Sequence, residues 1–107
     1  MKPTLTFVLL LVFATAALAA PKKGSSSVAL ELGTVLAAEE FCGLSYDTDK
    51  VTSFIEENVA ADDMRFASTL QLMTAGKQSE HKDMTATAKA AHCAQIRRVA
   101  KANGFIH

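Results

Sequence analysis

Two cysteines, Cys42 and Cys93, constrain the fold of this chain most strongly, because they are the only ones among its 107 residues. The N-terminus indicates where they work: Lys2 precedes an apolar run at 5–13 and a stretch of small residues at 14–20. This is the pattern of a secretory signal peptide. In an oxidising compartment two cysteines most simply form one intramolecular disulfide, and free thiols or metal thiolates are the alternative. Such a bond would stabilise the domain by roughly 4 kcal/mol in a chain-entropy treatment.

Cleavage of the leader is expected before Ala20, because Ala17 and Ala19 supply small side chains at the third-last and last positions of the signal peptide. The apolar run is shorter than the ~20 residues of a membrane helix, which argues against the alternative of a permanent anchor. We therefore expect a periplasmic or secreted protein with no membrane anchor after cleavage. The predicted segments are a signal peptide (1–19), a disordered lead (20–27) and a helical domain (28–107).

Apolar residues at three- and four-residue steps predict a first helix that begins at Val28, with Ser26 or Ser27 as its cap. Gly43 marks its end, because glycine adopts the left-handed conformation of a helix terminus without strain. Leu44 is then expected to fold back onto the last turn. Cys42 would therefore sit at a rigid corner.

Caps predict the next two helices. Asp47 or Thr48 would begin the second helix, and Asp62 and Asp63 would open the third by the same chemistry. We expect the third helix to continue through Gly76 to about residue 83, although a glycine inside a helix costs roughly 1 kcal/mol. The apolar face of the second helix consists of Val51, Phe54, Ile55 and Val59.

The fourth helix is predicted over 86–103, with Thr85 as its cap and Gly104 just beyond its end. Cys93 would lie on its inner side. No alternating apolar pattern or hairpin turn indicates a strand. The predicted fold is therefore all-α, a small four-helix domain stapled by one disulfide between Cys42 and Cys93.

Charge is balanced overall but segregated along the chain. The net charge is zero, which argues against nucleic acid as a partner. Nine acidic residues and one lysine lie between positions 31 and 63, whereas seven Lys and Arg and two acidic residues follow from position 64. The acidic and basic halves either form ion pairs with each other within one domain or hold two copies together as a homodimer.

No group of residues predicts chemistry. A catalytic site needs a nucleophile with a base, paired carboxylates or a phosphate loop, so we expect no enzyme and no catalytic, cofactor-binding or metal-binding residues. Asp47 and Asp49 resemble the start of a calcium loop, but the later glycine and acids are missing. His81 and His92 would share one side of a continuous helix, but the break expected at Thr85 argues against a metal site between them.

Three segments carry a resemblance to known proteins: Glu-Glu-Phe-Cys-Gly-Leu-Ser-Tyr-Asp at 39–47, Phe-Ile-Glu-Glu-Asn-Val-Ala-Ala-Asp-Asp-Met at 54–64, and Ala-His-Cys-Ala-Gln-Ile-Arg-Arg-Val-Ala-Lys at 91–101. Through them the chain resembles an uncharacterised group of small exported α-proteobacterial two-cysteine helical proteins. This resemblance implies a periplasmic helical domain and supplies no active site. In size, export, helical content and one long-range disulfide, the chain is also similar to HdeA-type acid chaperones.

Two functions agree with these features. The first is a small periplasmic helical interaction module that binds a protein partner through a helix face. The second is a periplasmic holdase chaperone that opens under acid stress and exposes its apolar faces. In the second case, protonation of the acidic cluster would drive the opening.

Overall fold

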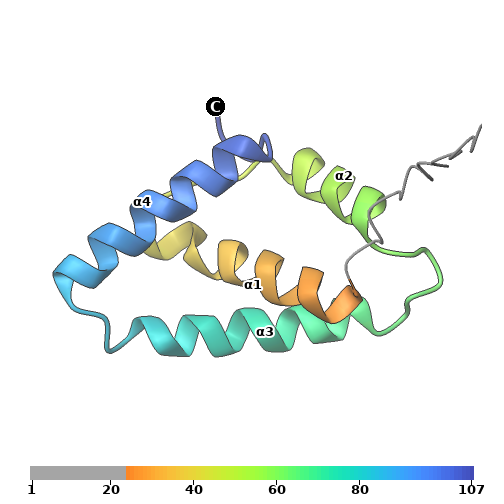
Figure 1. Cartoon of the computed structure of the whole chain (residues 1–107), viewed down its shortest axis with the longest axis horizontal. Coiled ribbons are helices and arrows are strands. Elements are labelled where there is room, and N and C mark those ends of the chain that lie inside the picture. The colour runs from red at the N-terminus through yellow and green to blue at the C-terminus, as the bar shows by residue number, and fades with distance from the viewer. Residues whose placement is uncertain (1–23) are drawn as a thin grey trace, which may run out of the picture.

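The computed structural model describes residues 24–107. The predicted signal peptide, its cleavage site and residues 20–23 lie outside the described residues. Four helices follow one another, α1 (Ser25–Phe41), α2 (Thr48–Asn58), α3 (Phe66–His81) and α4 (Ala86–Ala102), with no strand between residues 24 and 107 (Figure 1). The predicted all-α four-helix domain with one disulfide is confirmed.

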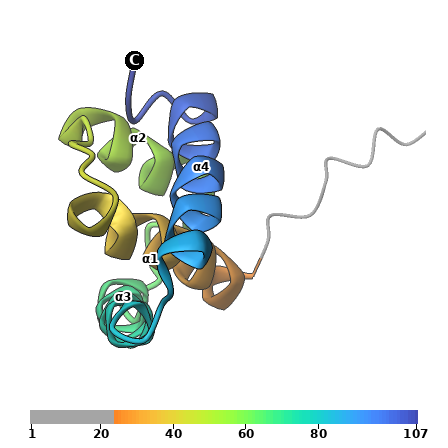
Figure 2. The ribbon, with the colours of Figure 1, turned by 90° about the vertical axis from the view of Figure 1, so that its left-hand side faces the viewer.

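Helix α1 forms the middle layer of the molecule. Both ribbon views place α3 on one side of α1 and place α2 and α4 on the other (Figures 1 and 2). Because neighbours cover opposite sides, α1 has no single apolar stripe, and its buried residues are distributed around the helix. They are Val28, Ala29, Leu32, Gly33, Val35, Ala37 and Ala38.

The closest helix packing joins α1 and α3, which run in the same direction (Figure 1). Gly33 makes this approach possible: a Cβ added there would lie 3.0 Å from the Cβ of Met73 and 3.2 Å from the backbone nitrogen of Thr74. A larger residue at position 33 would therefore push the two helices apart.

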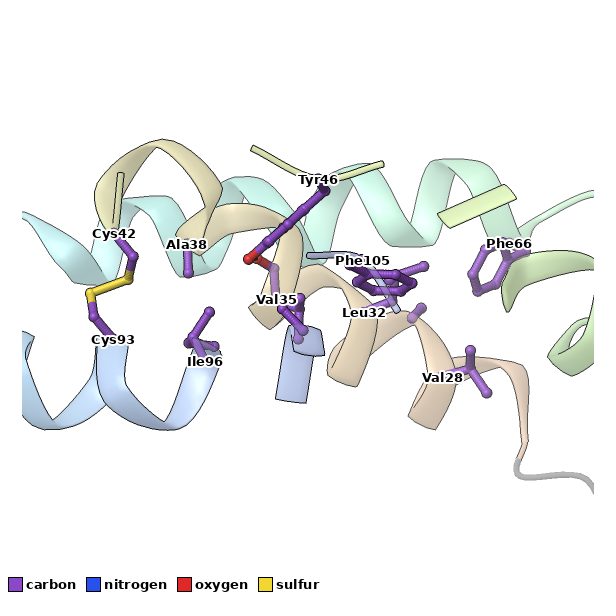
Figure 3. Close-up of a cluster of buried hydrophobic side chains, with 12 residues drawn as sticks. Val28, Leu32, Val35, Ala38, Cys42, Tyr46, Phe66, Cys93, Ile96 and Phe105 are labelled. Atoms are coloured by element: carbon purple, nitrogen blue, oxygen red, sulfur yellow. A yellow bond between two sulfur atoms is a disulfide. The ribbon is translucent and has the colours of Figure 1, made fainter. Parts of the chain in front are cut away.

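The core extends from the disulfide at one end to Phe66 and Val28 at the other (Figure 3). Phe105, which follows α4, is 1 % exposed and is a fully buried ring near its centre. Its ring centroid lies 5.8 Å from that of Tyr46 and 5.7 Å from that of Phe54. The C-terminal segment thus packs against both α2 and the connection that precedes it.

Glycines terminate α1 and α4 by the same geometry. Gly43 and Gly104 have φ angles of 66° and 75°. After Gly43 the amide of Leu44 donates to the carbonyl of Glu39 at 2.7 Å, and after Gly104 the amide of Phe105 donates to that of Ala100 at 2.8 Å. These are Schellman motifs, so both predicted helix ends and the fold-back of Leu44 are confirmed.

Two of the predicted caps are also confirmed. The Oδ1 atom of Asp47 accepts hydrogen bonds from the amides of Asp49 and Lys50, at 3.0 and 3.4 Å, and begins α2. The Oγ1 atom of Thr85 accepts from the amide of Ala88 at 3.1 Å and begins α4. Helix α3 runs without interruption through Gly76, as expected.

The start of α1 differs from the prediction. The helix begins at Ser25 rather than Val28, so the predicted disordered lead overlaps its first turn. The carbonyl of Gly24 accepts hydrogen bonds from the amides of Ser27 and Val28, at 3.0 and 3.2 Å, and no side chain caps the helix. The first amides of any helix have no acceptor within that helix. The serines therefore lie within the first turn of α1, and none of them caps it.

The start of α3 also differs. Asp62 and Asp63 do not open the helix, which begins at Phe66 after a series of turns. The Oδ1 atom of Asp63 accepts from the amide of Arg65 at 3.2 Å, two residues further on. This local bond stabilises a turn, and it competes with the cap geometry that the sequence suggested.

Candidate functional site

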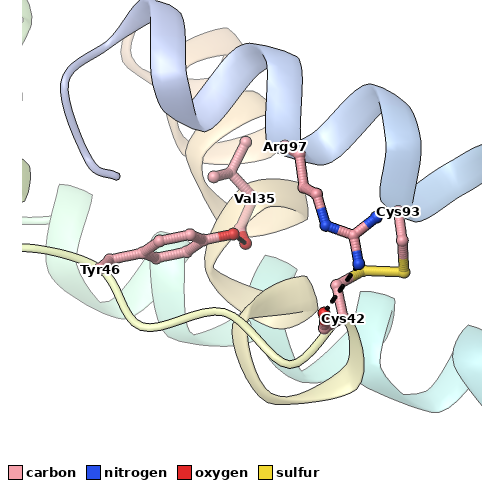
Figure 4. Close-up of a disulfide and its surroundings, with 5 residues drawn as sticks. All are labelled: Val35, Cys42, Tyr46, Cys93 and Arg97. Atoms are coloured by element: carbon pink, nitrogen blue, oxygen red, sulfur yellow. Dashed lines mark hydrogen bonds between the residues drawn. A yellow bond between two sulfur atoms is a disulfide. The ribbon is translucent and has the colours of Figure 1, made fainter. Parts of the chain in front are cut away.

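The disulfide joins the end of α1 to the middle of α4. Cys42 and Cys93 are both buried, and their Cα atoms are 5.4 Å apart. The guanidinium of Arg97, one turn further along α4, donates to the carbonyl of Cys42 at 3.4 Å (Figure 4). The predicted pairing is confirmed, and the alternative of free thiols is wrong because neither cysteine is free.

Next to the disulfide lies a cluster that we call the Phe41 corner: Phe41, His81, Lys89 and His92. The ring of His81 stacks on Phe41, with centroids 4.2 Å apart and an interplanar angle of 16°. His92 lies 5.4 Å from His81 and 6.5 Å from Phe41, measured between centroids. The ammonium of Lys89 lies 4.4 Å from the Phe41 centroid. Three helices thus meet at one aromatic ring.

The corner brings together two histidines between which the chain breaks, as the sequence predicted. The break after α3 exists, but it does not separate His81 from His92. The connection over 82–85 reverses the chain, so α4 returns past the end of α1 and brings His92 back to His81. The disulfide was the available signal, because Phe41 precedes one bonded cysteine and His92 precedes the other.

Both histidines are packed as rings in the corner. His81 is 9 % exposed, and the Nε2 atom of His92 is buried without a hydrogen-bond partner. Burial lowers the pKa of His81, the nearby His92 and Lys77 lower it further, and Glu80 opposes them. The neutral form of His81 is therefore favoured in the folded protein.

Two shallow hollows flank the corner, with volumes of about 440 and 620 Å³. Glu40 and Phe41 line both. His81 and Lys82 line the smaller hollow, and Lys89 and Arg97 line the larger one together with the disulfide. Within residues 24–107 no three histidine, cysteine, aspartate or glutamate residues are grouped so that they could hold a metal ion.

Tyr46 fastens the connection after α1. Its hydroxyl donates to the carbonyl of Val35 at 2.8 Å (Figure 4). Its amide donates to the carboxylate of Glu39 at 2.6 Å. Burial, reinforced by Glu39, raises the pKa of the Tyr46 phenol to about 12. The sequence analysis placed Tyr46 in a short connection and did not identify this clasp.

Three large apolar side chains are exposed among the described residues. Leu72 on α3 is 72 % exposed and Met64, just before α3, is 86 % exposed. Leu30 on α1 is 44 % exposed. The sequence analysis did not identify these three residues.

In the described part of the chain, no ion pair joins an acidic residue of 39–63 to a basic residue from position 65 on. The ion pair seen within residues 24–107 joins Lys77 to Glu80 at 3.4 Å, one turn apart in α3. In the same range, no helix is long and apolar enough to cross a membrane.

Comparisons with protein-family models, with curated proteins and with solved structures found no match to this chain. The resemblances drawn from the sequence therefore stay predictions.

Proposed function

We propose that this protein is a small periplasmic or secreted interaction module that binds a protein partner through α3 and the turn before it. The observation that carries the proposal is the exposure of Leu72 on α3, which is packed on α1, and of Met64 in the turn before α3. A few side chains that become buried near the centre of an interface contribute most of its binding energy. The buried disulfide supports an oxidising compartment.

A pair of charge-matched variants tests the proposal. Leu72→Glu places a carboxylate in the expected contact, while Gln71→Glu adds the same charge at the adjacent exposed position. The oxidised mature protein would be cross-linked in its own periplasm, and each captured protein would then be purified for direct binding measurements. We expect Leu72→Glu to weaken binding by at least about tenfold, or 1.4 kcal/mol, and Gln71→Glu to leave it nearly unchanged. Equal affinities for both variants would overturn the proposal.

The second candidate is an acid-activated holdase, and α2 is the observation in its favour. This helix contains no fully buried residue, and its apolar face is only partly covered. Its release would expose Phe54 and Ile55 to an unfolded client. Acidification to about pH 3 should then increase binding of an apolar dye and suppress aggregation of an unrelated protein. A protein that stays compact and protects nothing at that pH excludes the holdase.

A further inference from the structure

We propose that the Phe41 corner is an acid-opened latch, in which protonation of His81 and His92 releases the C-terminal end of α3 while the disulfide keeps α4 on α1. The inference concerns the fold itself and holds whichever function applies. In the last turn of α3, residues 78–80 are exposed and His81 is buried. The stack of His81 on Phe41 therefore fastens this end of α3.

The start of α4 is attached to the same corner by different contacts, among them the disulfide. Residues 86–91 are all exposed, and Lys89, His92 and Cys93 make the contacts with Phe41 and Cys42. The covalent bond keeps this part of α4 next to α1 whatever the charge of the rings. Opening must therefore move the end of α3 and the connection over 82–85.

Acid favours the open form over the closed form, because the closed form holds the two imidazole rings close together. Two imidazolium rings about 5 Å apart would repel each other, and Lys89 already occupies a position over the same aromatic ring. The buried Nε2 atom of His92 has no acceptor for an added proton. The open form exposes both rings to water, which solvates a charge on either of them.

The surrounding charges do not offset this repulsion. Four cations and two carboxylates lie around the Phe41 corner or line the hollows beside it, and one of these carboxylates, that of Glu80, is already paired with Lys77. These groups are Lys77, Glu80 and Lys82 on or beside α3, Glu40 on α1, and Lys89 and Arg97 on α4.

The sign of the pH dependence follows from linkage. His81 binds its proton less readily in the closed form than at its ordinary pKa of 6.5. The stabilisation by the stack is therefore complete above that value and is lost as the pH falls below it. A histidine that ionises only in the open form can increase the open population at most about thirtyfold at pH 5.

Amide hydrogen exchange of the oxidised full domain, followed residue by residue by NMR at pH 7.5 and 5, tests the latch. After correction for the intrinsic pH dependence of exchange, we expect the amides of residues 78–82 to lose about tenfold or more of their protection at pH 5. The amides next to the disulfide, at 40–44, should keep theirs. A wild-type protein whose α3 end is equally protected at both values would overturn the proposal.

Two variants separate the latch from general acid sensitivity. The double variant His81→Phe, His92→Phe keeps aromatic rings in the corner, but these rings cannot be charged. The protection of amides 78–82 in this variant should therefore not change with pH. His107→Gln removes the terminal histidine and should behave as the wild type. If the double variant does not fold, His92→Gln, at a half-buried position, should show a smaller response than the wild type. A full response in a folded uncharged variant contradicts the latch.

Discussion

Gly33 and Gly76 lie inside helices, and their surroundings predict opposite effects of the same added methyl group. At Gly33 the new Cβ meets Met73 and the backbone of Thr74, which belong to a packed helix and have little freedom to move. At Gly76 nothing lies within 4 Å. Only the first glycine is explained by packing.

We therefore expect Gly76→Ala to stabilise the domain by up to about 1 kcal/mol, because alanine is the better helix former. Gly33→Ala gains the same propensity but overpacks the α1–α3 contact, and we expect a net destabilisation of about 1 kcal/mol. Urea unfolding of both variants gives the free energies. A Gly33→Ala protein at least as stable as Gly76→Ala would mean that the two helices separate without cost.

At the scale of helices, most of the fold could be predicted because helix ends are local chemistry. Asp47, Thr85, Gly43 and Gly104 each act within a few residues of their own position, and all four act as predicted. The start of α3 was missed because Asp63 uses the same local chemistry for a turn.

The Phe41 corner could not be predicted from helix periodicity, because it depends on the direction in which α4 returns. Stacking of His81 on Phe41 joins positions far apart in sequence. The exposure of Leu72 likewise depends on which side of α3 meets α1. Such features are properties of tertiary packing.

Removal of the disulfide should weaken the attachment of α4. We expect Cys42→Ser combined with Cys93→Ser to leave a helical protein that is less stable by about 2–4 kcal/mol, because the unfolded chain loses a constraint over 51 residues. For a domain of this size that lowers Tm by on the order of 10–20 °C. Circular dichroism during heating measures both quantities, and the reduced wild-type protein is the matched control. An unchanged midpoint would show that the bond does not stabilise the fold.

At the scale of the whole molecule, no ion pair joins α2 to α4 within residues 24–107. Helix α4 carries Lys89, Arg97, Arg98 and Lys101 and no acidic residue, whereas α2 carries Asp49, Glu56 and Glu57 against Lys50 alone. Two copies related by a two-fold axis could bring α4 of each onto acidic surface of the other.

We predict a homodimer at low salt that weakens as salt rises, since such contacts are screened beyond roughly 10 Å at 0.1 M salt. Sedimentation of the mature protein at low and high salt is the measurement. A monomer under both conditions rules the dimer out, and a dimer indifferent to salt would show that apolar contacts hold it.

It is central to this account of the molecule that His81 is buried on Phe41 as a neutral ring. Titration of His81 tests this claim most directly. The Cε1 proton shift of His81, followed by NMR from pH 8 to pH 4 in the oxidised protein, reports the pKa of that imidazole. Because burial, His92 and Lys77 all favour the neutral form, we predict a value below the ordinary 6.5. A pKa at or above 6.5 in the folded protein would contradict the account.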